Sequence, residues 1–264
     1  MDLGLNGKIA IITGGSDGIG KETAKIMSSE GAKVSIFARN LDNLKTAKSE
    51  IEKTSGNTID IYSVNVMNKD EVEFGVKKVI EKHGYVDILV NNAGTSSAHS
   101  VMDLTDEIMG EDIGIKVYGA IYMIQKVVPS MKQNGGGSII NVTTPGGKAS
   151  PSNSIPTSLS RAAGISLTKS VSKELSQFNI RVNTVCVGLF KSGQHRKRYE
   201  QRIISEPSLS IDDFYKELGK SVPLGNRVGD PEEPASLISY LSSKQAGYIT
   251  GTAINIDGGS SPVV

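Results

Sequence analysis

The chain has 264 residues, a formal net charge of +1 and 38% hydrophobic residues. This is enough to bury a full core, and we expect a single domain over residues 1–264. The near-neutral charge argues against nucleic acid as a partner. Without a long apolar run, or a charged and then apolar leader at Met1–Lys8, the sequence predicts no membrane span and no secretory signal. The single cysteine, Cys186, excludes an internal disulfide, so we expect a cytoplasmic protein.

Short apolar runs alternate with segments of helical spacing along the chain. The runs with strand character are Lys8–Thr13, Lys33–Ala38, Asp60–Val66, Asp87–Val90, Ser138–Thr143, Ile180–Val187 and Thr252–Ile256. Seven strands that alternate with helices predict an α/β fold whose parallel sheet is covered on both faces. Residues 192–228 are too long for a plain connection and contain a helix-capping signal, Ser210-x-x-Asp213. We expect this segment to cover a site.

The first strand runs directly into a glycine-rich turn, Thr13-Gly14-Gly15-Ser16-Asp17-Gly18-Ile19-Gly20, and then into a helix. Glycines at 14, 18 and 20 allow a tight turn, bring backbone amides close to a pyrophosphate and pack the helix against the sheet. The alternative is a merely tight connection between a strand and a helix, because a glycine-rich turn alone is weak evidence for a nucleotide.

Further motifs follow the turn in a fixed order. They are Asn91-Asn92-Ala93-Gly94, Gly137-Ser138-Ile139-Ile140-Asn141-Val142, Arg181-Val182-Asn183, and Thr250-Gly251 with Asp257-Gly258-Gly259. Over about residues 5 to 260, the chain resembles the short-chain dehydrogenase/reductase family. The resemblance implies a doubly wound, Rossmann-type sheet of seven parallel strands in the order 3-2-1-4-5-6-7, with helices on both faces. The crevice of such a sheet lies at the carboxyl ends of its strands.

The resemblance also implies where a dinucleotide binds. The implied cofactor positions are Gly14, Ser16, Asp17, Gly18, Ile19, Gly20, Arg39, Asn65, Val66, Asn91, Ala93, Gly94, Arg161, Gly188 and Ser192. Ala38 and Arg39 stand where a carboxylate would select NAD, so NADP is preferred, with NAD as the second choice. Alternatively, Arg39 stacks on the adenine without selecting either cofactor. Asn65 retains a carbonyl oxygen that could accept from the adenine amino group.

The family's four catalytic positions are all altered. Thr144 stands at the serine, Thr157 and Arg161 replace the Tyr-x-x-x-Lys pair, and Lys116 takes the place of an asparagine. Thr144 keeps a hydroxyl that could bind a substrate oxygen. Thr157 lacks the acidity and the reach of a phenol. Arg161 can still point into the site and bind ribose hydroxyls, but it cannot shuttle a proton. Alternatively, its helix is a plain core helix with polar residues outward.

Lys116 has two interpretations. If it points inward, it lies near Arg161, where like charge and desolvation would lower its pKa toward neutrality and suit it to be a general acid. Alternatively, it reaches solvent from the helix edge or binds a structural carboxylate.

After the sixth strand, Gly188 and Ser192 are expected to help to seat the nicotinamide. The basic cluster from Gln194 to Arg198 could receive an anionic substrate group such as a carboxylate, a phosphate or an acyl-carrier thioester, and His195 could supply a proton. A solvated helix face is the alternative. The sequence predicts no metal site, because no histidine, cysteine and carboxylate cluster has ligand spacing.

Two classes of function remain open. The first is an NADP-dependent oxidoreductase with a non-standard proton donor, acting on a carbonyl, an imine or a conjugated C=C group of a small molecule. The second is a cofactor-binding sensor or partner protein without turnover. The resemblance further implies a homodimer or homotetramer, paired through helices near Thr105–Lys132 and Thr157–Gln177. The apolar outer positions that would form this interface are Ile121, Ile124, Val128, Leu167 and Val171.

Overall fold

The computed structural model describes residues 2–264, and seven parallel strands form its central sheet. These strands are β1 (Ile9–Thr13), β2 (Lys33–Ala38), β3 (Asp60–Ser63), β4 (Ile88–Asn91), β6 (Gly137–Thr143), β8 (Ile180–Val187) and β9 (Ala253–Ile256). Their spatial order, β3-β2-β1-β4-β6-β8-β9, is the order that the resemblance implied. Two short strands, β5 (Ala98–His99) and β7 (Ile155–Pro156), form a separate antiparallel pair and account for the gaps in the numbering.

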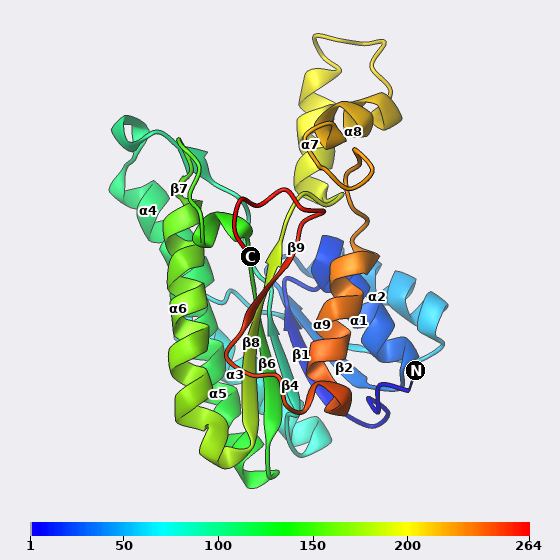
Figure 1. Ribbon diagram of the computed structural model, residues 1–264. Coiled ribbons are helices and arrows are strands. Elements are labelled where there is room, and N and C mark those ends of the chain that lie inside the picture. The colour runs from blue at the N-terminus through cyan, green and yellow to red at the C-terminus, as the bar shows by residue number, and fades with distance from the viewer. Residues whose placement is uncertain (1) are drawn as a thin grey trace.

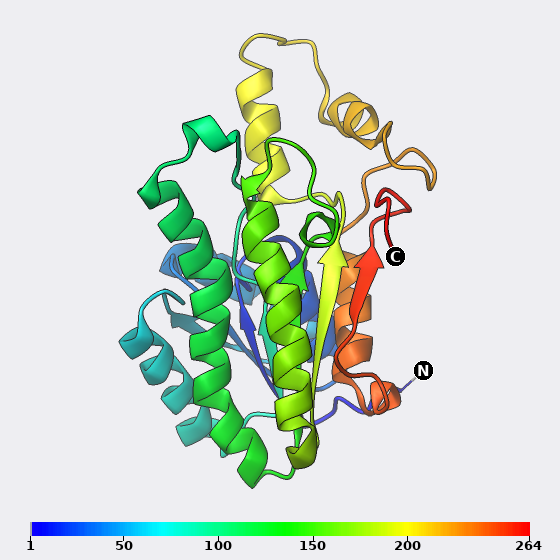
Figure 2. The same ribbon diagram turned by 60° about the vertical axis from the view of Figure 1, so that its left-hand side comes forward.

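Helices cover both faces of the sheet, as Figures 1 and 2 show. They are α1 (Gly18–Ser29), α2 (Leu41–Ser55), α3 (Lys69–His83), α4 (Asp106–Ile113), α5 (Gly119–Gln133), α6 (Thr157–Leu175), α7 (Gly193–Arg202), α8 (Ile211–Gly219) and α9 (Glu232–Ser242). The long helix expected over Thr105–Lys132 is divided, because a π-helical turn at Gly114–Tyr118 separates α4 from α5. None of the helices within residues 2–264 is long and apolar enough to span a membrane.

Two hydrophobic cores hold the helices to the sheet. Successive side chains of β1 point to opposite faces. Ala10 and Ile12 belong to the core that α1, α2 and α9 share, whereas Ile9 and Ile11 belong to the core that includes α3 and α5. All four are at most 2% exposed. Burial on both faces explains the nearly continuous apolar strands. Because all neighbouring strands pair in parallel, their carboxyl ends lie at one edge of the sheet.

The crevice position follows from the strand pairing. β1 pairs with β2 on one side and with β4 on the other, so the chain order reverses between β1 and β4. Ligands of such sheets bind beyond the carboxyl ends at this point. Helices α7 and α8 stand beyond the same edge (Figure 1, top). The capping signal was correct, because the Ser210 hydroxyl accepts from the backbone amide of Asp213 at 3.1 Å and begins α8.

The apolar positions expected on the outer faces of α5 and α6 differ in their burial. Ile124 is only 8% exposed and lies in the core with α3, so its assignment as an outer position was wrong. Ile121, Val128, Leu167 and Val171 are half-buried. Helix phase explains the difference, because Ile124 follows Ala120 by four residues on the face that α5 buries.

Candidate functional site

The turn between β1 and α1 is shaped by backbone geometry. Gly14 and Gly18 have φ values of +65° and +52°, in the left-handed region that favours glycine. A Cβ on Gly20 would lie 2.3 Å from the carbonyl oxygen of Gly14. The side-chain amide of Asn92 donates to the carbonyl oxygens of Thr13 and Gly14 at 3.1 and 3.2 Å. The turn is thus held with the N-terminus of α1 at the carboxyl end of β1, an arrangement that binds phosphate groups.

The position expected to select the adenosine end lies just after β2. Arg39 is exposed, and no ion pair within residues 2–264 engages its guanidinium. After β3, Val66 is buried as part of the core. The Asn65 Oδ1 accepts from the backbone amide of Met67 at 3.2 Å. One lone pair of the oxygen that we expected to face adenine is thus used by the chain's own turn, and the second remains free to accept.

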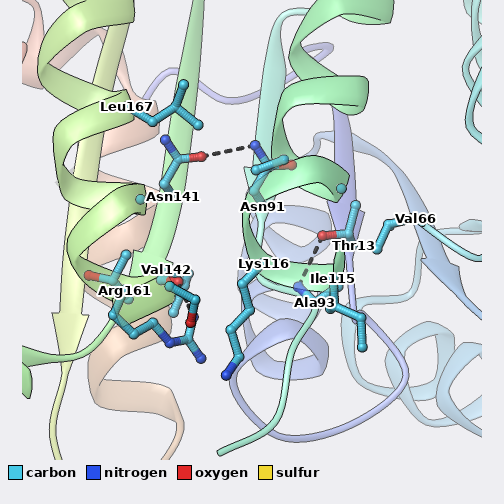
Figure 3. A pocket seen from close by; sticks show the side chains of 15 residues that line it. Thr13, Val66, Asn91, Ala93, Ile115, Lys116, Asn141, Val142, Arg161 and Leu167 are labelled. Carbon is cyan, nitrogen blue, oxygen red and sulfur yellow. Dashed lines mark hydrogen bonds between the residues drawn. The ribbon is translucent and has the colours of Figure 1, made fainter. Parts of the chain in front are cut away.

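Beside this turn, the Asn91–Gly94 segment lines the crevice with its backbone. The Asn91 side chain points into the protein, where its Nδ2 donates to Oδ1 of Asn141 at 2.9 Å (Figure 3). The amide of Ala93 donates to the Thr13 hydroxyl at 3.1 Å. Gly94 has a φ of +152°, and a Cβ there would lie 3.2 Å from Cγ of Lys116. The loop therefore passes close to the reacting centre that the sequence predicted.

Lys116 lies on the π-helical turn between α4 and α5 and is 8% exposed. Figure 3 shows its amine directed toward the guanidinium of Arg161. Its Nζ donates to Oδ2 of Asp112 and, at 3.2 Å, to Oγ1 of Thr157. Burial and, to a smaller extent, the charge of Arg161 lower the pKa of Lys116, Asp112 opposes both effects, and the net pKa is about 8. Both interpretations are thus partly realised, because the lysine points inward and also binds a carboxylate.

Asp112 was missed by sequence reasoning. It is 6% exposed, and of the residues of α4 only Asp112 is buried. The available signal was its spacing, because a residue four positions before Lys116 lies on the same side of a helix.

Arg161 lies on α6, one turn beyond Thr157, with its guanidinium directed into the interior. One terminal nitrogen donates to the carbonyl oxygen of Val142 at 2.8 Å, and Nε has no hydrogen-bond partner in the described part of the chain. Burial lowers the pKa of Arg161 to about 10. The core-helix alternative, with outward polar residues, does not describe Arg161. Only part of the guanidinium is left for the ribose contact that the resemblance implies.

The two threonines differ in their surroundings. Thr157 is 8% exposed, and its Oγ1 accepts from the amide of Ser97 at 2.8 Å as well as from Lys116. Two donors fill both lone pairs of this oxygen, so its hydroxyl hydrogen remains available to donate. Thr144 is half-buried beyond the carboxyl end of β6, and its hydroxyl does not cap the short turn that follows.

The segment after β8 differs in part from expectation. Gly188 is required, because a Cβ there would lie 2.5 Å from Cβ of Asp257. The Ser192 hydroxyl accepts from the amide of His195 at 3.3 Å and caps α7, so the hydroxyl expected at the nicotinamide has a helical role. His195 Nδ1 lies 2.7 Å from the carbonyl oxygen of Phe190. Burial lowers the pKa of His195, which makes it a poorer source of a proton at neutral pH.

The start of α7 rests against both walls of the crevice. Gln194 pairs with the backbone of Ser96 through two hydrogen bonds, of 2.9 and 3.3 Å. Gly193 lies so close to the exposed Asp17 that a Cβ on it would be 2.0 Å from the carboxylate. The basic residues that follow, Arg196 to Arg198, are exposed, which favours the solvated-face interpretation.

Lys116 lines a narrow cavity of about 20 Å³ together with Asn91, Asn141 and Arg161 (Figure 3). This volume suits a single water molecule. Asn91 and Arg161, which both line the cavity, each have a buried polar atom without a partner. Within residues 2–264 no group of three or more histidine, cysteine, aspartate or glutamate side chains could hold a metal ion.

The fold and these motifs define a nucleotide-binding reductase frame, and comparison with known proteins gives the family. A family model described as enoyl-(acyl carrier protein) reductase matches residues 14–261. The chain belongs to the short-chain dehydrogenase/reductase family. A 3-oxoacyl-[acyl-carrier-protein] reductase of Thermotoga maritima is 36% identical over 255 residues, which are 97% of this chain and 98% of that protein.

Solved structures agree with this assignment. L-Sorbose reductase from Gluconobacter frateurii, crystallised with NADPH and L-sorbose, matches with a TM-score of 0.95 and 30% identity over the whole of both chains. An NADPH-bound short-chain oxidoreductase from Pseudomonas aeruginosa, described as containing an atypical catalytic center, matches with a TM-score of 0.90 and 28% identity. The match covers 97% of this chain and 98% of that one. An altered reacting centre in this frame therefore has a structural precedent.

Proposed function

We propose that this chain is an NADP(H)-dependent oxidoreductase that acts on a carbonyl, an imine or a conjugated C=C group of a small molecule, with Lys116 as the proton donor. The observation that carries the proposal is a buried amine with a pKa of about 8, held beside Arg161 and Thr157 in the crevice of an oxidoreductase fold. A general acid works best when its pKa lies near the working pH.

The cofactor end of the crevice fits NADP(H). The glycine turn leaves no room for a side chain at Gly20, and open space surrounds the place where a Cβ would stand on Gly18. Arg39 is exposed where a 2′-phosphate would bind, and no ion pair within residues 2–264 engages its guanidinium. The structural relatives that were crystallised with NADPH support the same choice. When bound, the nicotinamide supplies the hydride that reduces the substrate.

The chain's own residues would manage the proton and the charge. During reduction of a carbonyl an N–H bond of the Lys116 ammonium breaks, and an O–H bond forms on the substrate oxygen that receives the proton. An imine would receive the same proton on its nitrogen, and a conjugated C=C group on its α carbon. The Thr144 hydroxyl orients the carbonyl oxygen. The Arg161 guanidinium adds positive charge beside the oxyanion as it develops, inside a site of low dielectric. Residues 192–228 cover the substrate, with the start of α7 seated against Ser96.

A cofactor-binding protein without turnover is the second candidate. One observation favours it: the protein itself already supplies hydrogen-bond partners to Lys116, Thr157 and Arg161. A substrate would have to compete for the Lys116 amine and for the bonded nitrogen of Arg161. In that case the chain would serve as a redox sensor or as the partner of an active relative.

The two candidates differ in NADPH oxidation. We expect turnover with at least one member of a panel that contains a 3-oxoacyl thioester, L-sorbose, a cyclic imine and an enone. Lys116→Ala should abolish this turnover without changing NADPH affinity, whereas Thr144→Ala should cost less, about one net hydrogen bond. Full activity in Lys116→Ala would support the oxidoreductase activity but refute Lys116 as the proton donor. Turnover by no member of the panel would favour the sensor.

A gain-of-function variant sharpens the test. The double substitution Thr157→Tyr with Arg161→Lys restores the family's acid and its lysine in the same frame. We expect weak carbonyl reduction in this variant, even if the wild-type protein has none. NADPH binding measured in parallel shows whether the altered crevice still holds the cofactor.

We also propose that the protein forms a homodimer or homotetramer through α5 and α6. Half-buried apolar side chains such as Ile121 and Val128 remain on these helices and would be covered by a second copy. Light scattering at micromolar concentration measures the assembly, and a monomer there would contradict the proposal.

A further inference from the structure

Unpartnered polar atoms gather at the Lys116 site. Four buried side-chain polar atoms within residues 2–264 have no hydrogen-bond partner, and three of them are Asn91 Oδ1, Asp112 Oδ1 and Arg161 Nε. Asp112 binds Lys116 directly, and the other two residues line the cavity beside it. Buried polar groups are normally satisfied, so such a cluster indicates a place where function outweighs stability.

Asp112 occupies a position that the fold would otherwise give to an apolar side chain. Counting back in steps of four from Ile124 and Ala120 on the buried face of α5 leads through Lys116 to Asp112, and all four residues are buried. A carboxylate is costly to bury unless a cation pairs with it. The acid and the lysine therefore form one unit, built into the wall of the crevice.

The charges that act on the Lys116 amine come from two elements. Arg161 approaches from α6 and disfavours the charged amine, as does burial. Asp112 approaches from α4 and favours it. The neutral groups nearby are the Thr157 hydroxyl and the Asn91 amide. The Cys186 thiol, whose pKa is raised by burial, raises the pKa of Arg161. One carboxylate thus opposes both influences that would discharge the lysine.

We infer that Asp112 is the positioning residue of this site: its carboxylate holds the Lys116 amine against Thr157 and keeps that amine charged at neutral pH. The inference rests on the proposed role of Lys116 as the proton donor. Without Asp112, burial and Arg161 act unopposed, the amine loses its proton before the substrate arrives, and the anchor that directs it toward Thr157 is lost.

The test follows the charge of Lys116 itself and needs no substrate. Protein labelled with [ε-13C]lysine is titrated by NMR, and the Lys116 signal is assigned by its loss in Lys116→Met. We expect a midpoint near pH ~8 in the wild type. In Asp112→Asn the midpoint should fall by at least about one unit, a tenfold loss of proton affinity. Asp112→Glu keeps the charge and should keep the midpoint within about half a unit.

Asp87→Asn is the matched control. Asp87 is also buried, at 5% exposure, and also pairs with a lysine, Lys8, but it lies before β4 at the other end of the sheet. This variant should lose stability without moving the Lys116 midpoint. Calorimetry with NADPH confirms that each variant retains the cofactor crevice.

An unchanged midpoint in folded Asp112→Asn would overturn the inference, as would an equal shift in Asp87→Asn. If Asp112→Asn does not fold, Asp112→Glu decides, because a full-unit fall there would show that the carboxylate charge does not hold the amine. The proposed function fails in a different way: NADPH is not oxidised with any member of the panel, while the Lys116 midpoint still responds to Asp112.

Discussion

The two ends of the crevice are built in different ways. At the phosphate end, the turn from Gly14 to Gly20 depends on backbone geometry and on contacts that only glycine allows. At the reacting end, side-chain charges of Asp112, Lys116 and Arg161 are buried close together. The first end is a sterically defined cradle that tolerates little change in shape. The second is an electrostatic balance, in which removal of one member changes the state of the others.

The largest expected effect concerns that balance. Asp112→Asn should lower the free energy of unfolding by about 3–5 kcal/mol, because it leaves Arg161 buried without a counter-charge and forces Lys116 to give up its proton. Lys116→Met should cost clearly less, because Asp112 still attracts Arg161. Urea unfolding of both variants measures the difference. Equal losses would mean that Arg161 does not share the carboxylate.

Gly20→Ala probes the cradle. The added Cβ would meet the Gly14 carbonyl oxygen at 2.3 Å and the Asn92 amide at 2.5 Å, so the turn must shift. We expect NADPH affinity to fall at least about 100-fold, equivalent to about 2.7 kcal/mol. Gly110→Ala is the control, because its Cβ would meet nothing within 4 Å. Calorimetry measures the NADPH affinity of both variants. If the two affinities agreed within a factor of three, the steric requirement for glycine at position 20 would be refuted.

The pH dependence of stability tests the reacting end, where the pKa of Lys116 is shifted. The folded-state pKa of Lys116, about 8, lies below its ordinary value of 10.5. Below pH ~8 the lysine is charged in both states and its burial cost is fully present. Between pH ~8 and ~10 the unfolded state binds more protons, so stability rises with pH, by about 2 kcal/mol from this group. Urea unfolding at several pH values measures this rise in the wild type relative to Lys116→Met. The same change in the free energy of unfolding with pH in both proteins would contradict it.

The smallest effect is expected at Arg39. NADPH should bind at least tenfold more tightly than NADH, a difference of about 1.4 kcal/mol, because the guanidinium can pair with the 2′-phosphate. Arg39→Ala should remove most of this preference and leave NADH affinity unchanged. Calorimetry with both cofactors tests it, and equal affinities in the wild type would show that Arg39 does not select.

The fold was predictable because its signals are local and repeated. The apolar runs that end at Thr13, Ala38 and Val187 have the same ends as β1, β2 and β8. The third strand ends earlier than predicted, at Ser63, because the chain then turns and the Asn65 side chain binds Met67. Apolar periodicity does not register such a turn, since Val64 and Val66 remain buried after the strand has ended.

The site was predictable only in part. Spacing placed Lys116 beside Arg161, since family motifs fix which positions face the crevice. Spacing did not reveal that Asp112 would be buried with the lysine, or that Ser192 would cap α7. Such pairings depend on helix phase and on local hydrogen-bond competition. The sequence alone does not show whether a charged residue or a hydroxyl faces solvent, a helix end or a cofactor.

The π-helical turn at Gly114–Tyr118 contains one residue more than an α-helical turn, and the orientation of Asp112 relative to α5 depends on this extra residue. In a π-helical turn the backbone amide bonds five residues back, here from Gly119 to the Gly114 carbonyl, which accommodates one residue more than an α-helix would. Loss of that residue would rotate α4 by about 100° relative to α5. The packing of α5 against the sheet would survive, while Asp112 would turn away from the crevice. Deletion of one residue between Asp112 and Lys116 would therefore separate the carboxylate from the amine and leave the glycine turn after β1 in place.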